Sequence, residues 1–167
     1  GQLLSAQEKY VVLEVEVPAG RDGSSQSLAS VDVAYLNLSS KQRDALDGKV
    51  AVGYSRSQER VKAAVNPGVQ VQSMNLTANA ASKEALKLRD AGKVEEAKDV
   101  LRGQASGFAK AAASLPSSAP VEVLQELNEK AAEYEDEAEA FDDEQNWNRN
   151  RKNLKAKQYK YDRQQTY

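Results

Sequence analysis

The chain has 167 residues, of which 40% are hydrophobic and 29% are charged, and 23 Lys and Arg against 25 Asp and Glu give a net charge of −2. This balance supplies apolar side chains for a modest core and excludes a fully disordered chain. The chain contains neither Cys nor His, which excludes thiol nucleophiles, Ser-His-Asp triads and the usual zinc and haem ligands. No apolar run approaches the length of about 18 residues that a membrane span needs, so none is expected.

The first residues show no targeting segment, because no basic stretch leads into an apolar core. The chain begins with Gly1 and not with Met, and we therefore expect it to start inside a longer polypeptide. The absence of Cys favours no compartment, since it fits both a reducing cytosol and an exported bacterial protein.

The first 65 residues alternate apolar and other side chains with a period of two, which is typical of half-buried β-strands. Short connections between such strands indicate antiparallel pairing. We therefore expect a four-stranded antiparallel sheet over residues 1–65, resembling half of a β-sandwich. The expected strands are 9–17, 28–38, 49–55 and 59–65, with a turn at Asp47-Gly48 and a hairpin loop at 55–58.

At Asn66-Pro67 the hydrophobic period changes to about 3.6, and Asn66 is suited to cap a helix that starts at Pro67. Helices are expected at about 67–91, 93–115, 121–141 and 145–163, the first two as an antiparallel hairpin. The apolar stripe loses phase at 142–146, where either one long helix bends or an Asp caps a new helix. A break is favoured, because Asp caps helices well and propagates them poorly. The expected fold class is α+β, with a bundle of three or four helices over 66–167.

Residues 22–27 have the composition of a metal-binding loop, because they approach the pattern Asp-x-Ser-x-Ser. Gln26 stands where that pattern needs its last Ser, and the segment joins two expected strands and leads into no helix. Asp, Gly and Ser are also what an ordinary connecting loop uses. We expect such a loop, with no metal and no cofactor in the chain.

Opposite charges are segregated near the end of the chain. Residues 122–144 contain eleven acidic residues against Lys130, and residues 149–163 contain seven basic residues against Asp162. We expect the carboxylates to lie on a solvated helix face and the basic segment to fold back against them. A partner-seeking tail is the second interpretation. The third and least favoured is nucleic-acid binding through basic residues and interleaved tyrosines.

Candidate contact residues come from the tail and from the edge of the expected sheet. Trp147, the only Trp, heads a stripe with Leu154 and Tyr161 and is expected to anchor packing, an exposed interface position being the alternative. No motif places carboxylates, Lys or Tyr for catalysis, so we expect no enzyme. The candidates for protein contacts are Trp147, Tyr159, Tyr161, Val12, Glu14 and Glu16.

Segments spread over nearly the whole chain carry a family resemblance. They are residues 3–18 (LLSAQEKYVVLEVEVP), 28–35 (LASVDVAY), 65–67 (VNP), 90–97 (DAGKVEEA) and 151–155 (RKNLK). In this order they resemble the region after the A domain in bacterial von Willebrand factor type A domain proteins, of the kind described as Ca-activated chloride channel-like or inter-α-trypsin-inhibitor heavy-chain-like. The metal motif of that family lies in the A domain, so the resemblance places no metal ligand on this chain.

The resemblance implies a non-enzymatic structural and interaction region that is accessory to an A domain and supports adhesion or protein assembly. In related architectures an A domain is inserted into a β-sandwich whose first strands come from upstream. The implied partner is an upstream A domain or missing β-strands of the same polypeptide, with a homodimer through a sheet edge as an alternative. The family suggests the bacterial cell envelope or secretion, with the cytoplasm left open. The alternative function is binding of nucleic acid or an anionic surface through the basic tail.

Overall fold

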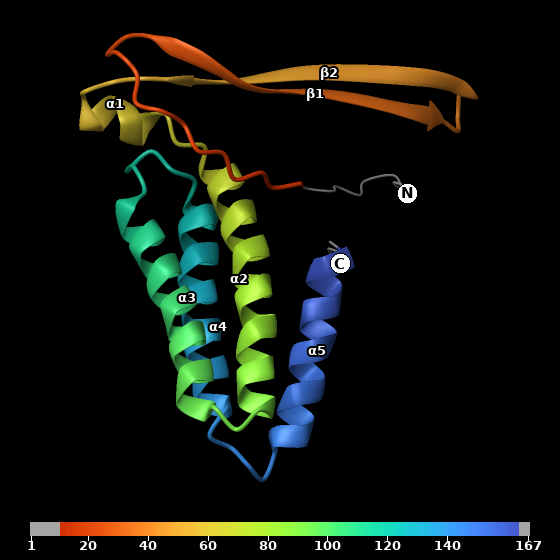
Figure 1. Ribbon diagram of the computed structural model, residues 1–167, viewed down its shortest axis with the longest axis vertical. Helices are drawn as coiled ribbons and strands as arrows, with labels where there is room; N and C mark the ends of the chain where they lie inside the picture. The colour runs from red at the N-terminus through yellow and green to blue at the C-terminus, as the bar shows by residue number, and fades with distance from the viewer. Residues whose placement is uncertain (1–10, 164–167) are drawn as a thin grey trace. The chain divides into compact units, whose positions relative to one another are not determined.

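The computed structural model describes residues 11–163. In this part of the chain two strands are followed by five helices, so that the fold is α+β (Figure 1). The chain divides into two compact units. Leu13–Ala64 forms one unit and holds both strands and the first helix, while Val65–Tyr167 belongs to the other and holds the remaining helices.

The strands β1 (Ser25–Asn37) and β2 (Gln42–Gly53) form a two-stranded antiparallel sheet, which we call the ribbon. A β-bulge between Ser27 and Ala29 shifts the register near the start of β1. The loop between the strands is shaped by Asn37. Its Oδ1 accepts hydrogen bonds from the backbone N–H groups of Ser39 at 3.1 Å and Ser40 at 3.4 Å, as Asn side chains do in tight turns.

The expected four-stranded, half-sandwich-like sheet is wrong. Residues 11–20 lie outside both strands, and residues 9–10 of the first expected strand lie outside the described residues. Alternating apolar side chains make a segment suitable for a sheet, but a strand also needs a neighbouring strand to pair with its backbone N–H and C=O groups. The expected turn at Asp47-Gly48 is wrong as well, because both residues lie inside β2, opposite Asp32 and Val31.

The fourth expected strand is instead the short helix α1 (Gln58–Ala63). The Oγ atom of Ser57 accepts a hydrogen bond from the backbone N–H of Arg60 at 3.3 Å and so caps the helix. Glu59 lies in the first turn, where a negative charge is favourable. The segment 55–58 is therefore a helix start and not a hairpin loop, and the described residues form five helices in place of three or four.

Four longer helices form the second unit. They are α2 (Pro67–Asp90), α3 (Val94–Ser114), α4 (Val121–Ala140) and α5 (Trp147–Arg163). Asn66 caps α2, since its Oδ1 accepts a hydrogen bond from the Val69 N–H at 3.2 Å, and Pro67 occupies the first turn. These bounds lie within two residues of the ranges that the hydrophobic stripes predict.

The connection from α2 to α3 is a Schellman turn centred on Gly92. Gly92 has a φ of 80°, in the left-handed region that glycine adopts without a Cβ penalty. The Lys93 N–H donates to the Leu88 carbonyl at 2.9 Å, and the Gly92 N–H donates to the Arg89 carbonyl at 3.0 Å. These two bonds satisfy carbonyls at the end of α2 and allow α3 to start after only three residues.

The core of the second unit lies between α2, α3 and α4, which run side by side in Figure 1. The rings of Phe108 and Tyr134 stack with their centroids 5.7 Å apart, an arrangement that adds to simple area burial. Small side chains let the helices approach closely. The buried alanines of this core are Ala78, Ala85, Ala97, Ala105, Ala111, Ala112 and Ala138.

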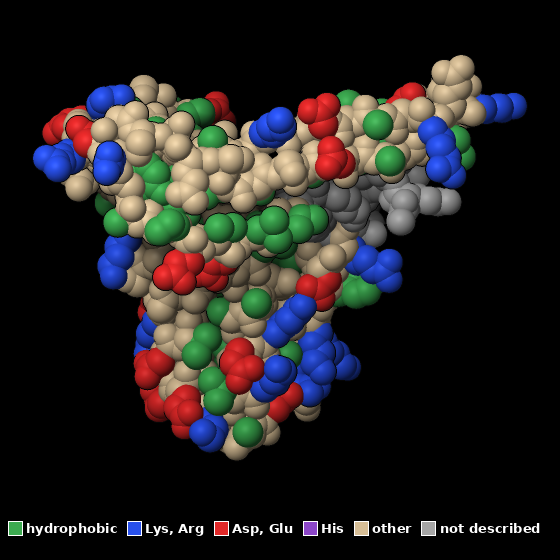
Figure 2. All heavy atoms as spheres, turned by 45° about the horizontal axis from the view of Figure 1, so that its top comes forward, with side chains coloured by type: hydrophobic (Ala, Val, Ile, Leu, Met, Phe, Trp, Pro, Cys, Tyr) green, Lys and Arg blue, Asp and Glu red, His purple; other side chains and the backbone are tan. Residues whose placement is uncertain are grey.

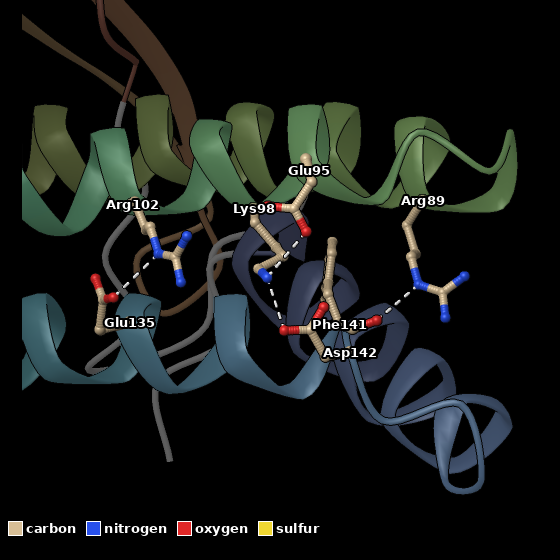
Figure 3. A network of polar contacts seen from close by, with 7 residues as sticks. All are labelled: Arg89, Glu95, Lys98, Arg102, Glu135, Phe141 and Asp142. Carbon is tan, nitrogen blue, oxygen red and sulfur yellow. Dashed lines mark hydrogen bonds and ion pairs between the residues drawn. The ribbon is translucent and has the colours of Figure 1, made fainter.

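Charged side chains fix the end of α4 (Figure 3). The nearly buried ammonium of Lys98 on α3 lies 2.7 Å from Asp142 and 3.1 Å from Glu95, while Arg89 donates through Nε to the Phe141 carbonyl at 2.8 Å. The chain breaks after α4, as the loss of phase favoured, and does not bend as one long helix. Asp143 stabilises the loop by accepting a hydrogen bond from the Asn146 N–H at 3.0 Å.

Candidate interaction surface

The ribbon has two unlike faces, because directly opposite residues of an antiparallel pair share a face. Val33 is opposite Leu46, and Ala29 is opposite Val50, whereas Ser30 is opposite Lys49 on the other side. The first face, which we call the apolar face, carries Ala29, Val31, Val33, Tyr35, Leu46 and Val50, with Gly48 opposite Val31 and one charged residue, Asp44, opposite Tyr35. The second face carries Ser30, Asp32, Ala34, Leu36, Arg43, Ala45, Asp47 and Lys49.

Nothing in its own unit covers the apolar face of the ribbon. Val33 is 46% exposed and Leu46 is 62% exposed, and no residue in the range 13–64 is buried. Each strand also has a neighbour on one side only, so both outer edges present unpaired backbone groups. Such a surface is what an interface needs, since isolated apolar residues are common on proteins but contiguous apolar faces are not.

Tyr54 ties the segment before the ribbon to its end. Its hydroxyl lies 2.9 Å from the Pro18 carbonyl and 2.9 Å from Oε1 of Gln26, and a Cβ on Gly20 would stand 2.4 Å from the Tyr54 ring. Gly20 therefore permits this close packing. Asp22 lies in the loop 22–27, whose composition resembles that of a metal-binding loop, and accepts a hydrogen bond from the Arg56 N–H at 2.9 Å. Among the described residues, no three Asp, Glu, His or Cys side chains are grouped to hold a metal ion.

Val12, Glu14 and Glu16 do not form a sheet edge. All three are exposed, but residues 11–20 pair with neither strand. The first expected strand therefore supplies no sheet edge, and the edges of the described sheet belong to β1 and β2. The signal for the apolar face is present in the sequence.

The three aromatic candidates on α5 have different surroundings. Trp147 is half-buried, with the Arg89 guanidinium 4.5 Å above its ring and Phe141 edge-on at 5.3 Å, so it anchors packing. Tyr161 is also half-buried and lies 2.6 Å from Nζ of Lys130 on α4. Tyr159 is 55% exposed, beneath the guanidinium of Arg163. Tyr159 alone among them presents much of its ring to solvent.

The basic segment contacts the rest of the bundle through several side chains. Lys157 lies 2.7 Å from Glu133 of α4 and also pairs with Glu137, as the opposite charges suggested. Arg151 instead binds Asp90 of α2, 2.6 Å away. Lys and Arg side chains gather over α5 on the right of Figure 2. Tyr167, one of the tyrosines interleaved with the basic residues, lies outside the described residues.

The two carboxylates that share Lys157 differ in their electrostatics. Burial raises the pKa of Glu137 above its usual value, and its Oε2 is buried without a hydrogen-bond partner. Burial also opposes ionisation of Glu133, but hydrogen bonds from Lys130 and Lys157 lower its pKa overall. Beside them a cleft of about 490 Å³ opens between α4 and α5, lined by both carboxylates, Lys157 and Leu154 among others.

No helix in the described part of the chain combines the length and apolar character that crossing a bilayer requires. No family model matches this chain, and no curated protein or solved structure is significantly similar to it. The residues and their geometry are therefore the basis of the functional argument.

Proposed function

We propose that this chain is a non-enzymatic structural and interaction region, whose ribbon is completed by β-structure from a partner. The observation that carries the proposal is the exposed apolar face of the ribbon, in a unit without a single buried residue. A two-stranded ribbon is marginal alone in water and becomes stable when further strands or a packed layer cover its apolar side. Covering half-exposed aliphatic side chains such as Val31 and Val33 would contribute about 1 kcal/mol each.

The partner that fits best is an upstream A domain or further β-strands of the same polypeptide. One face of a ribbon of this length covers about 400 Å², about half of what each partner buries in a stable complex. Two ribbons packed face to face would therefore fall short. A partner that also pairs with the outer edge of β1 or β2 adds backbone hydrogen bonds to the buried area. The resemblance to the region after a von Willebrand factor A domain supports the same partner.

The alternative of nucleic-acid or anionic-surface binding draws less support. Two of the seven basic residues, Arg151 and Lys157, are paired with Asp90, Glu133 and Glu137 within the bundle. A phosphate would have to displace these carboxylates. We therefore propose no nucleic-acid function.

The test joins this chain to the protein segment encoded directly upstream of Gly1 and measures amide hydrogen exchange in β1 and β2. We expect exchange in the ribbon to slow by at least about tenfold when the upstream segment is present, because opening then requires separation from the partner. The variant Leu46→Asp, on the apolar face, should abolish this gain. Ala45→Asp places the same charge one residue away on the other face and should retain it.

Two results would overturn the proposal. Unchanged ribbon exchange with the upstream segment attached would show that no partner is supplied there, and equal effects of the two Asp variants would show that the apolar face is not the contact. Analytical sedimentation of the chain alone tests the alternative of a homodimer. A concentration-dependent dimer that Leu46→Asp dissociates would replace the upstream partner by a second copy of the chain.

A further inference from the structure

Helix α5 contributes little to the apolar core. The fully buried core side chains come almost entirely from α2, α3, α4 and the Phe141 that ends α4, whereas α5 supplies Leu154 and the half-buried Trp147, which packs against Phe141. The other buried residue of α5 is Gln158, which is polar. The three preceding helices therefore supply most of the core, to which α5 adds these two apolar side chains.

Polar contacts between α5 and α2 are spread along both helices, beside the Arg89 guanidinium that lies over the Trp147 ring. Near the start of α5, Arg151 binds the Asp90 carboxylate through two nitrogens. Further along, Nε2 of Gln158 donates to the Ser82 hydroxyl at 3.0 Å. Toward the end, Asp162 accepts hydrogen bonds from Asn79 and Lys83, at 3.0 and 2.5 Å. Exposed ion pairs of this kind are weak and are screened by salt.

The contact between α5 and α4 depends on Lys157. Its ammonium lies between Glu133 and Glu137 and 4.9 Å from the centre of the Tyr134 ring. Next to it, the cleft of about 490 Å³ leaves space where close-packed helices would have side chains. Two further polar contacts join these helices: Lys130 and Tyr161 meet one turn further along α5, and near its start Asn150 donates to the Ala140 carbonyl at 3.4 Å.

We propose that α5 is a latch, which detaches from α2 and α4 as one unit while the three-helix core stays folded. Lys157 is the residue that holds α5 in the closed form, which we call the catch, because its side chain bridges two carboxylates of α4. The pivot is the loop 141–146, whose start is held by Arg89 and Lys98. Opening uncovers the flank of Tyr134 with its two carboxylates, Ser82 and Asn79 on α2, and the apolar surface that Trp147 and Leu154 cover in the latched form.

Native-state hydrogen exchange of the whole chain, followed by mass spectrometry, tests the latch. Peptides covering 147–163 should share one protection factor that is about tenfold or more below that of α2, α3 and α4. Raising the salt concentration should speed exchange in α5 and leave the other three helices unchanged. Protection that declines gradually toward residue 163 would mean simple end fraying and would overturn the proposal, as would equal protection in all four helices.

The variant Lys157→Met removes the catch and retains an unbranched side chain of similar length. We expect it to accelerate exchange in α5 by about tenfold without affecting α2 to α4. Lys152→Met makes the same chemical change at an exposed position of the same helix and should leave exchange in α5 unaltered. Equal acceleration by both variants, or no effect of Lys157→Met, would contradict the role of Lys157. Should Lys157→Met prevent folding altogether, the core would not be independent of α5, and the latch would be excluded.

Discussion

Lys157 pairs with two carboxylates, Glu133 and Glu137, whose pKa values are shifted in opposite directions. Glu133 is hydrogen bonded by two lysines, and its pKa lies below the usual value. Glu137 is more deeply buried, leaves one oxygen without a partner, and has a raised pKa. Ionised Glu137 therefore costs folding free energy at neutral pH, whereas ionised Glu133 contributes to stability.

The two Gln variants should accordingly change thermal stability in opposite directions. At pH 7, Glu137→Gln should raise the melting temperature by about 2 °C, because the amide resembles the neutral acid that the site prefers. This gain should shrink as the pH falls through the raised pKa of Glu137 toward 4.5, since the wild-type side chain then binds its proton in the folded state.

Glu133→Gln is the matched control, with the opposite sign. It should lower the melting temperature at pH 7, and the loss should persist down to about pH 4.5 and vanish only as the pH falls through the lowered pKa of Glu133. Scanning calorimetry or thermal circular dichroism measures the melting temperatures of both variants and of the wild type. A pH range from about 3 to about 8 spans the usual carboxyl pKa values. A lower melting temperature for Glu137→Gln at pH 7 would refute the assignment.

At the scale of elements, the turn between α2 and α3 depends on a single left-handed residue. Gly92→Ala should destabilise the chain by about 1 kcal/mol, because an alanine at a φ of 80° crowds its own backbone. Gly103→Ala, in the exposed interior of α3 where an added Cβ meets nothing within 4 Å, should instead stabilise it by about 0.5 kcal/mol. Urea denaturation measures both, and equal effects would contradict the role of the Schellman turn.

The long helices can be predicted from the sequence because their information is local. The stripe in α2, the Asn66 cap and the Pro67 start lie within a few residues of one another. The sheet cannot be predicted in this way, since the alternation in 9–17 does not say whether a neighbouring strand exists. The Ser57 cap with Glu59 in the first turn of α1 is a local signal that the apolar period of Val61, Ala63 and Val65 obscured.

The candidate site is less predictable than the helices. Which face of the ribbon is apolar follows from alternation alone, because Val31, Val33 and Val50 fall on alternate positions. That the face is uncovered depends on what packs against it, which no local pattern records. The Lys157 contacts could be anticipated only as a charge balance between 122–144 and 149–163, since the exact partners depend on how far α5 lies from α4.

At the scale of the whole molecule, the two units differ in how far they can fold alone. The second unit contains the whole hydrophobic core, and no residue in the range 13–64 is buried. We expect a fragment of residues 65–167 to retain helical circular dichroism and one cooperative thermal transition. A fragment of residues 13–64 should show no cooperative transition. Cooperative unfolding of the isolated 13–64 fragment would contradict the need for a partner.

The contacts between α2 and α5 also constrain how this chain tolerates insertions and deletions. The contacts move back along α2 from Asp90 to Ser82 and Asn79, by eight and then three residues, and forward along α5 from Arg151 to Gln158 and Asp162, by seven and then four. One residue inserted into α5 between positions 151 and 158 would turn everything beyond it by about 100° around the helix axis. Arg151 would keep its partner, and Gln158 and Asp162 would both lose theirs. We therefore expect added length to be tolerated better in the loop 141–146 than between positions 151 and 158 of α5.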